Sequence, residues 1–223
     1  MDKHLAVIQI EEDVRQENNQ VASEVRGIFK KHGIYAVNLI SSPGSGKTTL
    51  LVETLRFLKG LIPCAVIEGD QQTSNDAQRI AETGVPVVQV NTLQSCHLNA
   101  LQIKKSLDHL PIEKIRLLFI ENVGNLVCPA SMDLGENEKI VLMSVTEGED
   151  KPSKYPLAFL NSQLLILTKI DLLPYLRFDK QLCENNARKI NSNLEIIETC
   201  SYTREGISTW IDYLLLKAGS NSY

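Results

Sequence analysis

Short apolar runs alternate with segments of helical periodicity along most of the chain. The helical segments lie around residues 48–59, 76–82, 97–107, 179–191 and 206–216. The apolar runs between them read AVNLI, CAVIE, PVVQV, RLLFIE, KIVLMSV, LLILTK and LEIIET. Runs that are apolar on both faces and separated by helices are typical of parallel strands buried in a sheet. The pattern predicts an α/β fold with a mostly parallel central sheet flanked by helices.

A separate helical segment precedes this alternation. Val14, Val21, Val25 and Ile28 recur at near-helical spacing, and the segment 11–32 contains no proline, so a leading amphipathic helix should end near Gly33. The predicted organisation is therefore an N-terminal helical appendage at 1–33, a single α/β domain at 34–217 and a C-terminal tail at 218–223.

The charge, the apolar runs and the cysteine content of the chain limit which partners and which cellular compartment we expect. The 223 residues carry a net charge of −4 with basic residues scattered, which disfavours nucleic acid as a partner. No apolar run approaches the roughly 18 to 20 residues that span a bilayer, and the N-terminus turns acidic where a signal peptide stays apolar. We expect a cytoplasmic protein without a membrane partner, whose five cysteines serve packing, metal binding or catalysis.

The first predicted strand leads into a phosphate-binding loop. Residues 41–49 read SSPGSGKTT, which matches the phosphate-loop pattern except that Ser41 stands where glycine is usual. Lys47 can reach the β and γ phosphates, and the Thr48 hydroxyl can ligate Mg²⁺ at a helix N-terminus. The nucleotide-binding residues predicted here are Ser42, Pro43, Gly44, Ser45, Gly46, Lys47, Thr48 and Thr49.

The base is indicated by the end of a later strand. Thr168, Lys169 and Asp171 resemble the Asn-Lys-x-Asp motif of GTPases, in which the Asp carboxylate accepts two hydrogen bonds from guanine and the Lys stem covers the ring. Thr168 replaces the usual Asn, and a chance surface turn is the alternative. Ser201, in the later segment CSYTREG, matches a second base-contacting loop, although the two residues after it depart from the pattern.

Acidic side chains follow two other strands. Glu121 ends an apolar run and precedes Gly124, an arrangement that can hold Mg²⁺ and donate the glycine N–H to the γ-phosphate. Asp70 and Asp76 follow another run, and either could orient the attacking water or support Mg²⁺. Asp76 could instead cap the helix that follows it. With Lys47, we take Asp70 and Glu121 as the candidate catalytic residues.

A candidate transition-metal site comprises three further residues. Cys96 and His97 are adjacent, and Cys128 lies four residues beyond Gly124. They supply three thiolate and imidazole donors, so water or a second chain would complete a tetrahedral site for nickel or zinc. The alternative is a helix-capping loop with two ordinary buried thiols.

Taken together, these motifs resemble one family, the HypB nickel-insertion GTPases of nickel–iron hydrogenase maturation. The resemblance is carried from about residue 35 to 175 by SSPGSGKTTLL, VIEGDQQTSNDAQRI, Cys96-His97, IENVGNLVCPASMDLGE, GEDKPSKYP and LTKIDLLP. It implies a P-loop GTPase fold, GTP and GDP as ligands with Mg²⁺, and Ni²⁺ or Zn²⁺ bound by Cys96, His97 and Cys128 near the interface of a homodimer. Its expected partners are hydrogenase maturation proteins and the hydrogenase large-subunit precursor.

The resemblance also implies limits and alternatives. Related dimeric GTPases bring a lysine to the partner's nucleotide, which makes Lys154 a candidate, and turnover should be slow because no arginine is clearly placed as a catalytic finger. The chain has no His-rich stretch and no N-terminal Cys-x-x-Cys, so metal handling rests on the GTPase domain or on partners. Alternatives are a metal-storage or transfer protein that uses GTP only as a dimerisation switch, a related ATPase, and a urease-type GTPase. The last carries Cys-Pro-His, whereas Ala130 follows Cys128-Pro129 here.

Overall fold

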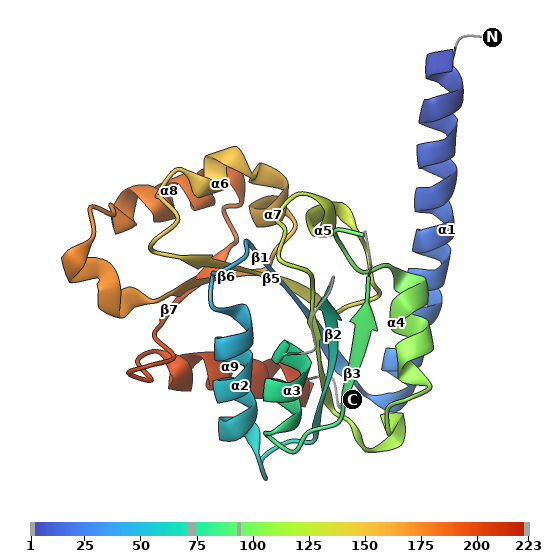
Figure 1. Cartoon of the computed structure of the whole chain (residues 1–223), viewed down its shortest axis with the longest axis horizontal. Helices are drawn as coiled ribbons and strands as arrows, with labels where there is room; N and C mark the ends of the chain where they lie inside the picture. The colour runs from blue at the N-terminus through green and yellow to red at the C-terminus, as the bar shows by residue number, and fades with distance from the viewer. Residues whose placement is uncertain (1–2, 71–74, 93–94, 221–223) are drawn as a thin grey trace.

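The computed structural model describes residues 3–70, 75–92 and 95–220, which form one layered α/β structure (Figure 1). Its strands are β1 (Tyr35–Ser41), β2 (Cys64–Asp70), β3 (Val87–Asn91), β4 (Leu117–Glu121), β5 (Glu138–Ser144), β6 (Leu164–Thr168) and β7 (Glu195–Thr199). They form one sheet in the order β3-β2-β4-β1-β5-β6-β7, with every pair parallel. All seven predicted runs are strands, so the predicted fold class is confirmed.

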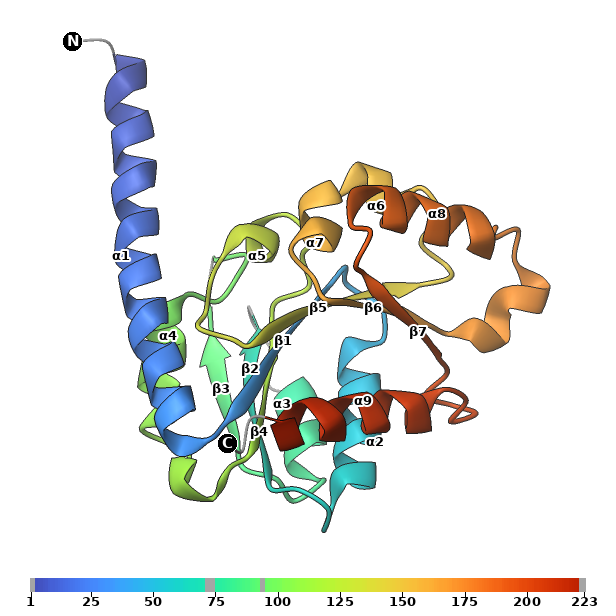
Figure 2. The same ribbon diagram turned by 180° about the vertical axis from the view of Figure 1, so that it is seen from behind.

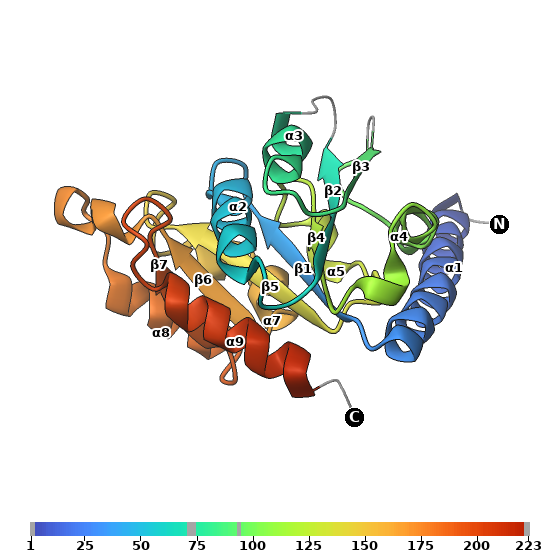
Figure 3. The same ribbon diagram turned by 90° about the horizontal axis from the view of Figure 1, so that it is seen from below.

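Helices cover both faces of the sheet (Figure 3). The α-helices are α1 (Lys3–His32), α2 (Lys47–Leu58), α3 (Asn75–Ala81), α4 (Ala100–Leu107), α5 (Cys128–Ser131), α6 (Lys151–Lys154), α7 (Pro156–Leu160), α8 (Lys180–Ile190) and α9 (Ile207–Ser220). Short 3-10 helices occupy Ile112–Lys114 (η1) and Ile170–Tyr175 (η2). Within the described residues no helix is both long and apolar enough to cross a membrane.

The core differs between the two faces. On one face α2, α3 and α9 pack on a single apolar cluster that includes Val37, Leu39 and Trp210. On the other face the apolar side chains form two clusters, one beneath α5, α7 and α8 and one beneath α1 and α4. Buried polar side chains from the middle of the sheet also lie on that second face.

Helix α1 ends where the sequence predicts but begins earlier than the segment 11–32. Gly33 adopts φ 62°, its N–H bonds the Lys30 carbonyl, and the Ile34 N–H bonds the Phe29 carbonyl at 2.9 Å. This is the glycine-terminated arrangement that closes many helices. The extension to Lys3 runs through residues without proline or glycine, and it projects beyond the sheet in Figures 1 and 2.

Helix α4 begins later than the predicted segment 97–107. Asn99 caps it by accepting the Gln102 N–H at 2.9 Å, while the Gln102 side chain accepts the Asn99 N–H. This reciprocal capping box starts the helix at Ala100. Cys96 and His97 therefore lie in the loop before the helix, so helical geometry does not fix the directions of their side chains.

Candidate functional site

The loop between β1 and α2 forms the wall of a 520 Å³ cavity. Gly44 and Gly46 adopt φ 77° and 88°, a left-handed conformation that side chains disfavour and that turns backbone N–H groups inward. All the predicted loop residues from Ser42 to Thr49 line this cavity. The space is concave, polar and placed at the N-terminus of α2, as phosphate binding requires.

Thr168 from β6 and Glu147 from the turn after β5 hold the phosphate loop through hydrogen bonds. The Ser45 hydroxyl donates to Glu147 Oε1 at 2.6 Å, and the Thr168 hydroxyl donates to the Ser45 carbonyl at 2.6 Å. Burial opposes ionisation of Glu147, yet hydrogen bonds from the Ser144 N–H and Ser45, with Lys151 2.9 Å away, hold its pKa below its usual range. The loop is thus preorganised before any ligand binds.

Carboxylates line the opposite wall of the cavity. Glu121, at the end of β4, accepts the Thr48 hydroxyl at 2.6 Å and the Lys47 ammonium at 3.2 Å, both on Oε1. Its Oε2 atom, and Oε2 of Glu68 on β2, are buried and have no hydrogen-bond partner within the described part of the chain. Asp70 and Asp76 also line the cavity. Negative charge therefore converges where a nucleotide-bound cation would lie.

The pKa of Glu68 reflects its burial beside these carboxylates. Burial, followed by the charges of Glu121 and two aspartates, raises the pKa of Glu68 to about 8, although Lys47 opposes the shift. Unpaired buried carboxylate oxygens are costly unless a cation or proton meets them. The hard oxygen donors of Thr48, Glu121 and Asp70 fit Mg²⁺, which prefers a few carboxylate ligands together with phosphate and water.

Gly124, which is predicted to face the γ-phosphate, lines the cavity beside the phosphate loop. A Cβ atom added there would lie 3.2 Å from both Cα and Cγ of Pro43, so the segment 121–124 touches the phosphate loop directly. The absence of a side chain permits this approach and leaves the backbone facing the cavity.

A second cavity of 180 Å³ adjoins the first and contains the predicted base-binding residues. Thr168, Lys169, Asp171 and Ser201 all line it, and the Lys169 ammonium donates to the Gly44 carbonyl at 2.7 Å. The buried Cys200 thiol also lines it and donates to Asp171 Oδ1 at 3.0 Å. Cys200 thus holds the carboxylate that the sequence assigns to base recognition.

The predicted metal ligands come together from two loops. The ligand atoms of Cys96, His97 and Cys128 lie within 4.8 Å of one another, and all three side chains are half-buried. Asn125 ties the two loops by donating to the Cys96 carbonyl at 3.4 Å. A hydrogen bond with the Cys128 thiol, followed by burial, raises the pKa of Cys96, and burial lowers the pKa of His97. A metal would therefore displace protons from the thiols as it binds.

Asp76 and Lys154, two further predicted nucleotide-binding residues, each form an ion pair with a neighbouring side chain. Asp76 lies 3.1 Å from the Arg79 guanidinium on its own helix, and Arg79 in turn donates to the Thr49 hydroxyl at 3.1 Å. Lys154 is exposed, pairs with Asp150 at 2.7 Å and is not among the residues lining the nucleotide cavity. Its predicted role toward a partner's nucleotide stays a prediction.

Three residues of the site were not identified from the sequence. Glu68 ends the apolar run CAVIE two residues before Asp70, and an acid at the end of a buried strand was a usable signal. Arg79 follows Asp76 by three residues, which places both on one face of a helix. Cys200 stands immediately after a predicted strand, at the edge of the sheet where ligand-binding residues of α/β folds gather.

Comparisons with known proteins agree with these features. The family model described as "CobW/HypB/UreG, nucleotide-binding domain" matches residues 35–198. The hydrogenase maturation factor HypB of Escherichia coli strain K12 is 53% identical over 208 residues, which cover 93% of this chain and 72% of that protein. The hydrogenase/urease maturation factor HypB of Helicobacter hepaticus is 41% identical, covering 96% and 89%. The crystal structure of HypB from Helicobacter pylori in complex with nickel matches with a TM-score of 0.87 at 38% identity, covering 92% and 96%.

Proposed function

The chain belongs to the HypB family of CobW/HypB/UreG nucleotide-binding proteins, and from that premise we propose that it is a GTP-hydrolysing nickel metallochaperone for hydrogenase maturation. The observation that carries the proposal is the position of the Cys96, His97 and Cys128 cluster. Cys128 follows Gly124, which lines the nucleotide cavity, by four residues, so one short segment contributes to both the nucleotide cavity and the cysteine–histidine cluster.

Guanine selection rests on Asp171 and Lys169. The Asp171 carboxylate accepts the two guanine donors that adenine lacks, while the Lys169 stem covers the base. The bond from Lys169 to the Gly44 carbonyl supports this role, because it joins the base site to the phosphate loop. Ser201 contributes from the facing loop of the same cavity.

For hydrolysis, the residues of the phosphate loop bind and orient the triphosphate. The Lys47 ammonium neutralises charge as the bond between the γ-phosphorus and its bridging oxygen breaks and water bonds to that phosphorus. Thr48, Asp70 and Glu121 hold Mg²⁺, which supplies further charge neutralisation at the phosphates when bound. Intrinsic turnover should be slow, because no arginine is clearly placed as a catalytic finger; Arg79 lines the cavity, but it contacts Asp76 and Thr49.

Nickel is the cargo, and zinc fits the same donors. Two thiolates and one imidazole leave a coordination position for water, a second subunit or an acceptor protein. We further propose that the chain works as a homodimer in which Lys154, exposed on α6, reaches the partner's nucleotide. The partners are the hydrogenase maturation proteins and the large-subunit precursor. The cycle runs in the cytoplasm, where GTP is available and thiols stay reduced.

Phosphate release and nickel binding test this proposal on the purified protein. With Mg²⁺ and GTP, the wild type should release phosphate above background, and Lys47→Ala should lose this activity. In a separate binding assay, ATP should displace a fluorescent guanine nucleotide poorly, whereas GTP should displace it well. GTP binding without turnover would instead support a storage protein that uses GTP as a switch. Nickel titration should show one site per chain that Cys96→Ala and Cys128→Ala abolish, and retention of that site in both variants would contradict the metal assignment.

A second candidate acceptor is urease, which the name of the Helicobacter hepaticus relative favours. Nickel transfer from the loaded protein to a purified hydrogenase precursor and to apo-urease, each assembled with its maturation partners, separates the two. Activation of urease alone would move the assignment to urease maturation.

A further inference from the structure

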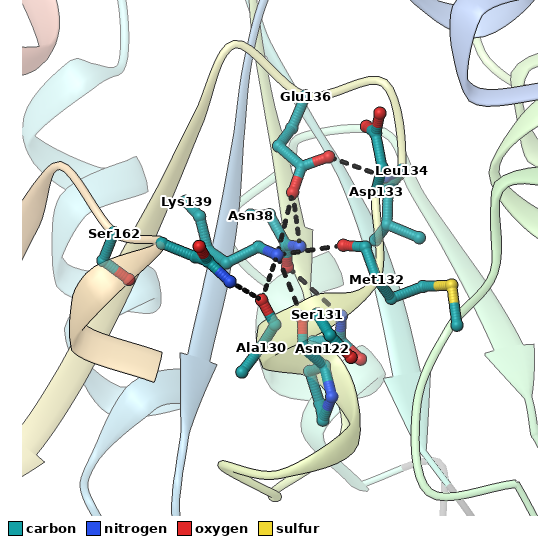
Figure 4. A network of polar contacts seen from close by, with 12 residues as sticks. Asn38, Asn122, Ala130, Ser131, Met132, Asp133, Leu134, Glu136, Lys139 and Ser162 are labelled. Atoms are coloured by element: carbon teal, nitrogen blue, oxygen red, sulfur yellow. Dashed lines mark hydrogen bonds and ion pairs between the residues drawn. The ribbon is translucent and has the colours of Figure 1, made fainter. Parts of the chain in front are cut away.

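A buried lysine holds the short helix that carries Cys128. Lys139 lies at the start of β5, and its ammonium donates to the carbonyls of Pro129, Ala130 and Met132 at 3.1, 2.9 and 2.9 Å (Figure 4). These are the carbonyls at the end of α5, whose first residue is Cys128. A cation at a helix C-terminus stabilises the helix, and here its three protons all have acceptors.

The lysine is the first member of a chain of buried polar side chains. Its ammonium lies 3.7 Å from Glu136 Oε1, and the same oxygen accepts the Asn38 amide at 3.0 Å. Asn38 Oδ1 then accepts the Asn122 amide at 3.2 Å. Asn38 pairs with Lys139 across β1 and β5, so the sheet itself fixes part of this chain.

The other end of the chain reaches both the nucleotide segment and the second ligand loop. Asn122 directly follows Glu121, and its Oδ1 accepts the Val123 N–H at 3.0 Å and the Leu98 N–H at 3.1 Å. Leu98 is the residue after His97. One side chain therefore joins the loop of Cys96 and His97 to the backbone that approaches the γ-phosphate.

This arrangement is more than core filling. Asn38 and Asn122 have no exposed surface, and the side chains of Glu136 and Lys139 are 7% and 8% exposed. The four groups lie on the face of the sheet where the apolar core is divided into two clusters. Well-packed apolar residues would serve stability as well, whereas a connected polar network fixes one geometry and resists partial rearrangement.

We infer that Lys139, Glu136, Asn38 and Asn122 form a relay that sets the position of Cys128 relative to Cys96 and His97 and couples it to the nucleotide state. The inference rests on the proposed function, since it needs GTP and a metal to bind the two ends. When the segment 121–124 shifts toward a γ-phosphate, Asn122 must move Leu98 and Asn38 with it or leave buried N–H groups unpaired. Asn38, Glu136 and Lys139 lie outside the nucleotide cavity and act only by positioning other groups, whereas Asn122 is among the residues that line that cavity.

The test compares nickel affinities of the full chain with GDP and with a non-hydrolysable GTP analogue, both with Mg²⁺. We expect the wild-type affinities to differ by about ten-fold, which lies within the usual range of coupling between sites. Asn38→Leu, which is close to Asn in size and removes both bonds at the centre of the relay, should bring the ratio near one while nickel still binds. By reciprocity, nickel should shift the affinity for the GTP analogue by the same factor in wild type and not in the variant.

Two further variants separate coupling from general destabilisation. Tyr213→Phe removes a buried hydrogen bond to Glu138, the residue before Lys139, but leaves the relay intact, so it should keep the wild-type ratio. Glu136→Gln is a milder break for use if Asn38→Leu does not fold. Asn38 donates to Oε1 and the Leu134 N–H donates to Oε2, and in Gln one of these two acceptors becomes an NH₂ donor. A wild-type ratio in Asn38→Leu or Glu136→Gln would overturn the relay and leave the proposed function standing. Equal affinities in the wild type would overturn the coupling itself.

Discussion

The Cys200 thiol offers a sharp test of the proposed guanine site. It is 2% exposed, donates to Asp171 Oδ1 at 3.0 Å and accepts the Thr203 N–H at 3.3 Å. Replacing it by Ala leaves Asp171 without that donor and frees the carboxylate to rotate. Replacing it by Ser keeps a donor and an acceptor at the same place, so Cys200→Ser is the matched control.

The size of the effect follows from the bond that is lost. A hydrogen bond to a charged group contributes roughly 1.5 to 3 kcal/mol, and a thiol is a weak donor, so about 1 to 1.5 kcal/mol is expected. Since 1.4 kcal/mol corresponds to a factor of about ten, Cys200→Ala should bind GDP roughly five- to ten-fold more weakly. Cys200→Ser should stay close to wild type.

Titration of a fluorescent GDP analogue, followed by competition with GDP, IDP and ADP, measures this directly. IDP lacks the 2-amino group, so the preference for GDP over IDP should fall in Cys200→Ala as the carboxylate loses its orientation. Unfolding in urea should accompany the titrations to confirm that both variants are folded. Equal GDP affinity in wild type and Cys200→Ala, with both folded, would refute the positioning role.

Three other changes test separate parts of the site. Without nucleotide or Mg²⁺, the folded protein retains a proton on Glu68 that the unfolded chain releases, so this group's contribution to stability falls as pH rises from about 4.5 to about 8. Between pH 6 and pH 8 the free energy of unfolding of Glu68→Gln should therefore fall by about 2 kcal/mol less than that of wild type in chemical denaturation, and identical pH dependence would contradict the raised pKa. Asp171→Asn should weaken GTP binding about a hundred-fold and favour xanthosine triphosphate, whose base can pair with an amide; calorimetric titration of both nucleotides checks this. Gly124→Ala places a methyl group 3.2 Å from Pro43 and should weaken the GTP analogue while sparing GDP, and an equal loss for both would locate the damage in the phosphate loop instead.

The sequence predicted the parts of this structure that depend on local pattern. The strand runs and the glycines of the phosphate loop are contiguous signals, and the cysteine and histidine ligands are rare residue types that stand out singly. Asn99 and Gln102 carried a readable capping signal that would have started α4 correctly. These features need no knowledge of which strands are neighbours.

The missed features depend on contacts across the sheet. Asn38 and Lys139 each stand inside a run that reads as a buried strand, and their link through Glu136 follows only from the register of β1 against β5. The unpaired oxygen of Glu68 likewise has meaning only once β2 lies beside β4 and its Glu121. Order along the chain does not specify such proximity.

The number of ligand residues in the candidate metal site has a kinetic consequence. Within the described residues, Cys96, His97 and Cys128 supply three ligand atoms, one fewer than a closed tetrahedral site requires. If the three residues bind the metal as proposed, a ligand from an acceptor can bind it before any of the three dissociates. Such associative exchange would transfer the ion without a free aquo ion, so the rate of delivery would depend on acceptor concentration as well as on dissociation of the ion.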